Sequence, residues 1–319
     1  MSELRYHPFL GQWVTTATHR QDRTFLPPDD YCPLCPTKPG GFPTEVPFEH
    51  YDIVVFQNKF PSLSPNPPEP AVIGSELMPV RPSHGVCEVV CYTEDHHATL
   101  ATLPFEQIQK LTRVWKDRYE TLAALDFVDY VFIFENKGKE IGVTLSHPHG
   151  QIYAYPFIPP TLTTELANER AHLEATGRNL FDDWLKVEST GERHVCENDT
   201  FVALVPFFAR YPYEVHVTSK EHLSSLAQMT PAHLDDLARI LLDVTKRFDK
   251  LFGFSMPYIM GMHQMPAIKG YEFNRFHVEF LPPYRTAKKL KYLAGSEASA
   301  GAFINDTLPE VTAKTLREL

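Results

Sequence analysis

The 319-residue sequence contains no apolar run that approaches the roughly 20 residues needed to span a bilayer. Its opening residues, MSELRYHPFL, also lack the apolar core of a signal peptide. Five cysteines, an odd number in a chain of this length, do not suit a disulfide framework. We therefore expect a cytoplasmic protein with reduced thiols and no membrane contact.

Positive charge is scarce as well, with 30 lysines and arginines against 40 aspartates and glutamates and a net charge of −10. No long basic stripe is present, which argues against nonspecific binding to nucleic acid or acidic membranes. A small phosphorylated ligand needs only a few local donors and stays open. A hydrophobic content of 43% is that of a soluble globular protein, and the length allows one large domain or two of about 150 residues.

Two cysteines form a Cys-x-x-Cys pair, Cys32 and Cys35, followed by a turn rich in proline and glycine. A redox pair would be followed by a helix, which this turn cannot start, so the pattern favours a zinc knuckle. Cys87, Cys91 and Cys196 lie in strand-like or apolar stretches, where small buried core residues are expected.

Two segments of the chain share a layout, one beginning at Glu88 and the other at Glu214. In each, a histidine follows the glutamate by eight residues, His96 in the first and His222 in the second. A proline and an amphipathic helical pattern come next, and a further strand-like stretch ends the segment. This layout indicates an internal duplication.

The stretch SHPHGQ at 146–151 comes at the end of a strand-like run and places His147 and His149 two residues apart. Side chains two apart on a strand share one face, so the two imidazoles should project side by side. In the second segment, His277 and Glu279 stand at the matching positions. One half is therefore expected to hold a reactive imidazole that the other half has lost.

The duplication predicts an α+β fold of two similar units, each with an antiparallel sheet and packed helices. We place the join near the proline-containing stretch 156–165. Residues 1–158 then form the half with the zinc knuckle and the nucleophile, and residues 159–319 form the other half.

Zinc usually takes four ligands, and Cys32 and Cys35 supply two. His96 and His147 are candidates for the other two because both are expected on or beside strands of the same half. Two alternatives stay open: His96 as a neighbour of a helix start, and His147 as a hydrogen-bonded core histidine.

His149 is a candidate nucleophile, since a neutral imidazole attacks phosphorus and forms a phosphoramidate that can be cleaved again. Gln151 lies one strand repeat further on the same face, where its amide can donate to a phosphoryl oxygen. Asn136, in the segment ENKG, adds a polar side chain and a glycine turn. These residues predict phosphoryl or nucleotidyl transfer.

The ordered set CPLC, ENKG and HPHGQ closely resembles the galactose-1-phosphate uridylyltransferase family, a branch of the histidine-triad superfamily. The likeness runs over almost the whole chain, from THRQDR (18–23) to KYLAGSE (291–297). It implies two histidine-triad-like repeats and a ping-pong reaction in galactose metabolism. UDP-glucose would give a uridylyl-His149 and glucose 1-phosphate, and galactose 1-phosphate would then take the uridylyl group to give UDP-galactose.

The resemblance also implies roles for particular residues. Cys32, Cys35, His96 and His147 match the family's structural zinc site, and Gln151 matches the residue that binds the transferred phosphoryl group. The other matching residues are expected to bind substrate: Arg20 and Arg23 at a neighbouring subunit's nucleotide, Asn58 and Lys59 on the uridine side, Asn136, Gly142, Val143 and Thr144 at the phosphates, and Lys291, Tyr292, Ser296 and Glu297 at the hexose.

A second metal, iron or a second zinc, is implied at Glu165, His263, His277 and Glu279. Here the chain departs from the family, because Glu279 stands where relatives often have histidine. The site is then either altered in metal preference or empty. Ser296 also departs, since some relatives carry tyrosine there, and this puts the hexose specificity in question.

The partners implied by the resemblance are UDP-glucose, galactose 1-phosphate and a second copy of the chain, in a homodimer with shared active sites. Two other readings compete with this one. One is a related nucleotidyltransferase with an adenylyl donor, and the other is a zinc-stabilised nucleotide-binding protein without turnover. A pure binder has no need of His149 together with Gln151, and covalent labelling by UDP-glucose separates the two classes.

Overall fold

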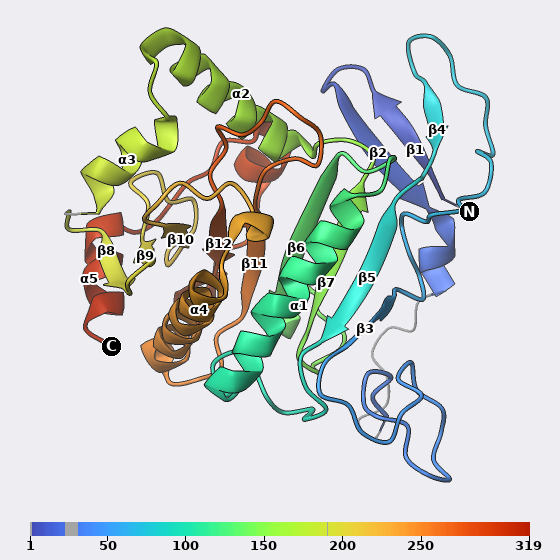
Figure 1. Cartoon of the computed structure of the whole chain (residues 1–319), viewed down its shortest axis with the longest axis horizontal. Helices are drawn as coiled ribbons and strands as arrows, with labels where there is room; N and C mark the ends of the chain where they lie inside the picture. Colours follow the sequence, from blue (N-terminus) through green and yellow to red (C-terminus); the bar gives the residue numbers. More distant parts are fainter. Residues whose placement is uncertain (1, 23–30, 190) are drawn as a thin grey trace.

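The computed structural model describes residues 2–22, 31–189 and 191–319. Within these residues, nine strands form a single antiparallel sheet that runs through both halves of the chain (Figure 1). Their order across the sheet is β3 (Val54–Gln57), β5 (Val86–Cys91), β7 (His149–Tyr155), β6 (Tyr130–Lys137), β11 (Tyr258–His263), β12 (His277–Leu281), β10 (Val215–Ser219), β9 (Phe201–Leu204) and β8 (His194–Glu197).

The expected α+β duplication is confirmed by the order of these strands. Outward from the centre, the first half contributes β6, β7, β5 and β3, and the second half contributes β11, β12, β10 and β9, with β8 as an additional edge strand. Helix α1 (Phe105–Ala123) follows β5 in the same way that α4 (Pro231–Phe252) follows β10. Each half is therefore the unit that its sequence pattern predicts.

The two units do not keep separate sheets, however. Strands β6 and β11 pair directly, with Asn136 opposite Ile259 and Phe134 opposite Gly261. Separate halves would each leave a row of unpaired backbone groups at this edge, and pairing satisfies both rows. The two units therefore share one sheet, whereas the sequence predicted a separate sheet in each unit.

The sequence match between Glu88 and Glu214 is not a structural match. Cys91 lies opposite His149 in one ladder, and His216 lies opposite Glu279 in the other, so Cys91 and His216 are equivalent. Glu88 is three residues before Cys91 and inside β5, whereas Glu214 is two residues before His216 and precedes β10. The two glutamates therefore occupy different places in the duplicated units.

One face of the sheet is covered by α1 and α4, which lie side by side (Figure 1). Helix α4 begins at a capping box, in which Thr230 accepts a hydrogen bond from the His233 backbone, and it ends at Gly253 with a positive φ of 74°. The apolar faces of the two helices bury Trp115 and Leu241 in one core that includes residues of both halves.

The opposite face is covered by smaller elements. The three-stranded sheet β2 (Gln12–Ala17), β1 (Ser2–His7) and β4 (Val80–Pro82) packs Leu4 with Cys87 near Tyr153. Helices α2 (Pro160–Thr176) and α3 (Leu180–Glu188) lie over the second half, where Trp184 packs against the β9 residues Val202 and Leu204. The remaining elements are α5 (Pro309–Arg317), β13 (Tyr284–Thr286), β14 (Lys289–Leu290) and the short turns Thr18–Asp22, Lys139–Ile141, Leu226–Gln228 and Gly295–Ser299.

The run before SHPHGQ is not one continuous strand as the sequence suggested. Strand β6 ends at Lys137, and the chain turns through Gly138 and Gly142, whose φ values of 101° and 85° suit glycine. Strand β7 begins only at His149, so His147 lies just before the strand. Among the described residues, no helix has the length and apolar character needed to cross a membrane.

Candidate functional site

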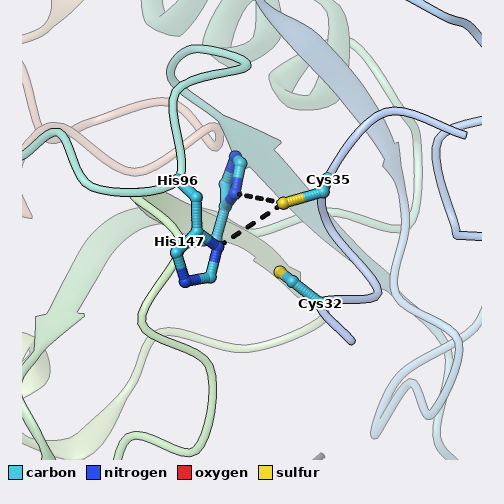
Figure 2. A group of neighbouring side chains, drawn as sticks. All are labelled: Cys32, Cys35, His96 and His147. Carbon is cyan, nitrogen blue, oxygen red and sulfur yellow. Dashed lines mark hydrogen bonds between the residues drawn. The ribbon is translucent and has the colours of Figure 1, made fainter. Parts of the chain in front are cut away.

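The Cys-x-x-Cys knuckle meets two histidines beside the start of β7 (Figure 2). The Sγ atom of Cys35 lies 3.5 Å from Nδ1 of His96 and 3.5 Å from Nδ1 of His147. Together with Cys32, these residues offer four ligand atoms within 4.8 Å of one another. Tetrahedral zinc with bonds of about 2.0–2.3 Å separates its ligand atoms by roughly 3.5 Å, so the arrangement fits zinc.

The histidine ligand candidates are held in a neutral, oriented form. Burial lowers the pKa of His147 to about 4, which keeps the imidazole uncharged at neutral pH. Its Nε2 lies 2.6 Å from the Tyr51 hydroxyl and 2.8 Å from the Thr93 carbonyl, so Nδ1 is the nitrogen that faces the thiols. Tyr51 was not singled out from the sequence, because nothing in its neighbourhood marks it as a partner of His147.

The two thiols of the knuckle favour a bound cation. Burial, followed by the nearby Cys32, raises the pKa of Cys35 to about 12, so two adjacent thiolates need a positive charge to form. Zinc would supply that charge and cross-link the knuckle to the sheet. The other three thiols, of Cys87, Cys91 and Cys196, are buried as the sequence indicated.

A cavity of about 270 Å³ lies next to this knuckle. Pro33 and Leu34, the residues between the two cysteines, form part of its wall, so the knuckle shapes the cavity. The full lining is Tyr31, Pro33, Leu34, Glu45, Phe56, Asn58, Lys59, Phe60, Val89, Thr144, Leu145, His149 and Gln151. Apolar walls with a few polar groups are typical of a small-molecule site.

His149 and Gln151 come from the same face of β7 and line this cavity together. The Nδ1 atom of His149 lies 2.7 Å from the His147 carbonyl oxygen. A carbonyl can only accept, so Nδ1 carries the proton and Nε2 of the neutral ring keeps its lone pair. This arrangement has the chemical form of a nucleophile.

The other residues expected around the nucleotide are distributed over two hollows. Asn58, Lys59 and Thr144 line the main cavity, with the Lys59 ammonium 3.0 Å from the Glu45 carboxylate. A smaller hollow of about 40 Å³, which also includes His149, is lined by Asn136 and Val143. Gly142 ends the turn that lies between these two residues in the chain.

The two N-terminal arginines cannot both be placed. The Arg20 guanidinium lies against its own chain, 3.4 Å from the Phe60 carbonyl oxygen and beside the Tyr153 hydroxyl. Arg23 lies outside the described residues.

The four residues expected at the hexose do not join the cavity that holds His149. Lys291 is buried, and its ammonium contacts the Ile304 carbonyl and lies 3.2 Å from Glu297. Ser296 donates to the Ala302 carbonyl over 2.7 Å, and Tyr292 is exposed. Within the part of the chain described, this segment mainly contacts itself.

The residues implied in a second metal site do come together. Glu165 from α2 lies 2.9 Å from Nδ1 of His263 on β11, and His277 and Glu279 follow on β12. Glu279 lies 3.8 Å from His263 and 3.9 Å from His277. Burial acts to lower the pKa of His263, but the two carboxylates raise it to about 9. Two imidazole nitrogens and two carboxylates fit a divalent transition metal.

A third group of possible metal ligands, Glu214, His216 and Glu279, lies against a positively charged side chain, that of Arg210. The Arg210 guanidinium lies 2.7 Å from Glu279 and 3.5 Å from Glu214, and His216 lies 2.9 Å from Glu214. We assign this group to an internal ion-pair network that holds Glu279 in place. Sequence reasoning missed His216, although the alternating pattern Glu214-Val-His216 on a strand was the available signal.

Comparison with known families gives matches over both halves of the chain. The family model described as galactose-1-phosphate uridyl transferase, N-terminal domain, matches residues 1–159. The model described as the C-terminal domain of the same enzyme matches residues 165–319.

Similar proteins carry the same description. A galactose-1-phosphate uridylyltransferase of Thermotoga maritima is 44% identical, and the alignment covers 100% of this chain and 98% of that protein. A protein of the same name from Streptomyces lividans is 39% identical, with 100% of this chain and 87% of that protein covered. A solved structure described as uridylyltransferase superimposes with a TM-score of 0.88 at 33% identity, over 99% of this chain and 97% of that one.

Proposed function

The chain belongs to the galactose-1-phosphate uridylyltransferase family, and from this premise we propose that it transfers a uridylyl group from UDP-glucose to galactose 1-phosphate through His149. The observation that carries the covalent step is the hydrogen bond between His149 Nδ1 and the His147 carbonyl, which leaves Nε2 as the nucleophilic nitrogen. The cavity beside it has room for part of a nucleotide.

In the first half-reaction, the Nε2 lone pair of His149 attacks the α-phosphorus of UDP-glucose. A phosphorus–nitrogen bond forms, the bond from that phosphorus to the bridging oxygen breaks, and glucose 1-phosphate leaves with the electron pair. In the second half-reaction, a phosphate oxygen of galactose 1-phosphate attacks the same phosphorus. The phosphorus–nitrogen bond breaks, UDP-galactose leaves and His149 regains its lone pair.

The neighbouring donors have roles that follow from their chemistry. The Gln151 amide and the side chain of Thr144 can donate to phosphoryl oxygens as charge develops there. Asn58 and Phe56 lie on the wall that would accept the nucleoside. Asn136 and Val143 lie beside His149 in the smaller hollow, where the leaving phosphate would be held.

The variant His149→Gly tests this proposal. We expect transfer to fall on the order of 10⁴-fold or more, because the covalent route loses its nucleophile, while the melting temperature stays close to that of the wild type. UDP-glucose labelled at the α-phosphorus should leave acid-labile label on the wild type and none on the variant. A parallel incubation with labelled ADP-glucose tests whether the protein uses an adenylyl donor instead.

His50→Gly is the matched control, because His50 is 77% exposed and pairs with Glu94 away from the cavity. It should keep both transfer and label. Substantial transfer by purified His149→Gly protein would remove His149 as the nucleophile.

We propose zinc at Cys32, Cys35, His96 and His147, supported by the spacing of the donor atoms. For Glu165, His263, His277 and Glu279 we propose a divalent ion, iron or a second zinc. We also propose that the protein is cytoplasmic, which agrees with its five free thiols.

We also propose a homodimer with shared active sites, as the family resemblance implied. The exposed Tyr292 and the separation of its segment from the cavity that holds His149 agree with a role at a partner subunit's site. Mixed dimers of His149→Gly and Arg23→Ala subunits should regain activity, because one intact site forms per mixed dimer. Demonstrated subunit exchange without any return of activity would contradict the shared site.

A further inference from the structure

On β7, the strand that carries His149, Tyr153 makes a contact that the reaction as described does not use. Its hydroxyl lies 3.3 Å from Oε1 of Gln151, two residues away on the same face of β7. Two ring contacts hold Tyr153, with Phe134 at 5.1 Å and Tyr155 at 5.9 Å between ring centroids.

The direction of this hydrogen bond decides which end of the Gln151 amide faces the cavity. A tyrosine hydroxyl can donate or accept, and a glutamine amide can do either with its two ends, so the pair alone leaves two arrangements. An anionic phosphoryl group needs the amide nitrogen, because the amide oxygen would repel it.

Arg20 resolves the choice. Its guanidinium lies 3.4 Å from the Phe60 carbonyl oxygen and near enough to the Tyr153 hydroxyl for its charge to act on that group. A guanidinium has only donors and its positive charge attracts the lone pairs of the Tyr153 oxygen, which directs the hydroxyl proton to Oε1 of Gln151. The amide nitrogen is then the end that remains for the cavity.

We propose that Arg20 and Tyr153 are positioning residues that hold the Gln151 amide with its nitrogen toward the phosphoryl group transferred by His149. The inference rests on the proposed function, and it gives Arg20 a role within its own chain. Neither residue touches the reacting atoms. Both act through Gln151, so their effects must depend on Gln151 being present.

The test uses Tyr153→Phe, which removes only the hydroxyl, with Tyr155→Phe as the matched control two residues further along the same face. We expect Tyr153→Phe to lower kcat about tenfold with KM for UDP-glucose changed less than about threefold, because orientation of a transition-state donor is lost. Tyr155→Phe should stay within about twofold of the wild type.

A double-mutant cycle separates positioning from general structural support. In a Gln151→Ala background, Tyr153→Phe should have no further effect on kcat, whereas a purely structural role would add its full effect. Arg20→Met, which leaves β7 intact, should lose its effect in the same background. Additive effects for both variants, or equal kcat for Tyr153→Phe and Tyr155→Phe, would overturn the inference.

The proposed function can fail separately. If His149→Gly keeps its activity, the nucleophile assignment is wrong whatever Tyr153 does. If His149→Gly is inactive and the Gln151 cycle is additive, only the positioning role is wrong.

Discussion

At the scale of single residues, the proposed zinc site adjoins the cavity that holds His149. Pro33 and Leu34 line the cavity, and the cysteines on either side of them carry two of the four metal donors. A change at a ligand should therefore affect the metal first, then stability, and only then substrate binding.

We predict that Cys32→Ser lowers bound zinc by one equivalent per chain and lowers the melting temperature, because metal binding is coupled to folding of the knuckle. KM for UDP-glucose should rise as the cavity wall loosens. Metal analysis of the purified protein and a thermal melt measure both effects. Cys196→Ser is the control, since that buried thiol is not part of the metal group and its loss should leave the zinc content unchanged. An unchanged zinc content in Cys32→Ser would remove it as a ligand.

Glu135 is a buried residue of β6, the strand that pairs with β7. It accepts from Tyr92 over 3.4 Å and from Tyr258 over 3.3 Å, and burial raises its pKa to about 7. Between the ordinary value of 4.5 and about 7, the folded state holds a proton that the unfolded state has released. The free energy of unfolding therefore falls by about 3 kcal/mol as the pH rises through that window.

We predict that Glu135→Gln removes this pH-dependent loss, because a neutral amide can accept from one tyrosine through its oxygen and donate to the hydroxyl oxygen of the other through its nitrogen. The variant should be about 1–3 kcal/mol more stable than the wild type at pH 8 and close to it at pH 5. Urea denaturation at the two pH values measures the difference. The exposed Glu174→Gln should show no such difference between pH 5 and pH 8. A stability gain in Glu135→Gln that is the same at both pH values would contradict the shifted pKa.

At the scale of elements, the glycine of HPHGQ is required by what lies behind β7. A Cβ atom on Gly150 would come 2.3 Å from the Tyr92 hydroxyl and 3.2 Å from the Phe134 carbonyl oxygen. Tyr92 is fully buried and bonded to Glu135, so it has little freedom to move away. The small residue lets β7 lie close to its support, with His149 and Gln151 on the opposite face.

We predict that Gly150→Ala destabilises the protein by about 1–3 kcal/mol through overpacking and also lowers kcat, since both neighbours of Gly150 are proposed reaction groups. Adding Tyr92→Phe removes the hydroxyl that the new methyl group meets and should restore part of both losses. Denaturant midpoints and steady-state rates of the single and double variants test this. A double variant no better than Gly150→Ala alone would show that the clash lies elsewhere.

At the scale of the whole molecule, the two duplicated halves share one sheet and one core. The Tyr119 hydroxyl of the first half donates to the Met265 carbonyl of the second over 3.0 Å, and Arg113 pairs with Asp235 at 2.7 Å. With β6 paired to β11, neither half has a complete core of its own. We therefore propose that the boundary between 158 and 159 marks a repeat within one cooperative unit.

We predict that the fragments 1–158 and 159–319 are each poorly soluble alone and form a soluble complex when produced together, because each leaves a long strand edge and an open core face. The full chain with its metals bound should unfold in one transition, with the same midpoint by circular dichroism and by fluorescence. Two separate midpoints, or a fragment that folds alone, would show that the halves are independent domains.

The sequence by itself determined the local features of this protein. The helices α1 and α4 follow from apolar spacing after a proline, the duplication follows from matching segments, and the chemistry follows from Cys-x-x-Cys and HPHGQ. These features depend on residues close together in the chain, where periodicity and turn chemistry act directly. The family resemblance added the grouping of Glu165 with His263, which α2 and β11 bring together.

Only the tertiary structure decided which distant groups meet. Tyr51 contacts His147 from 96 positions away, Arg210 contacts Glu279 from 69 positions away, and β6 pairs with β11 across the repeat. Such contacts depend on how whole elements pack, and a single arginine or tyrosine in the sequence carries no mark of the partner it will find. For that reason the residue types of the site could be predicted, whereas the supports that orient His147, Glu279 and Gln151 could not.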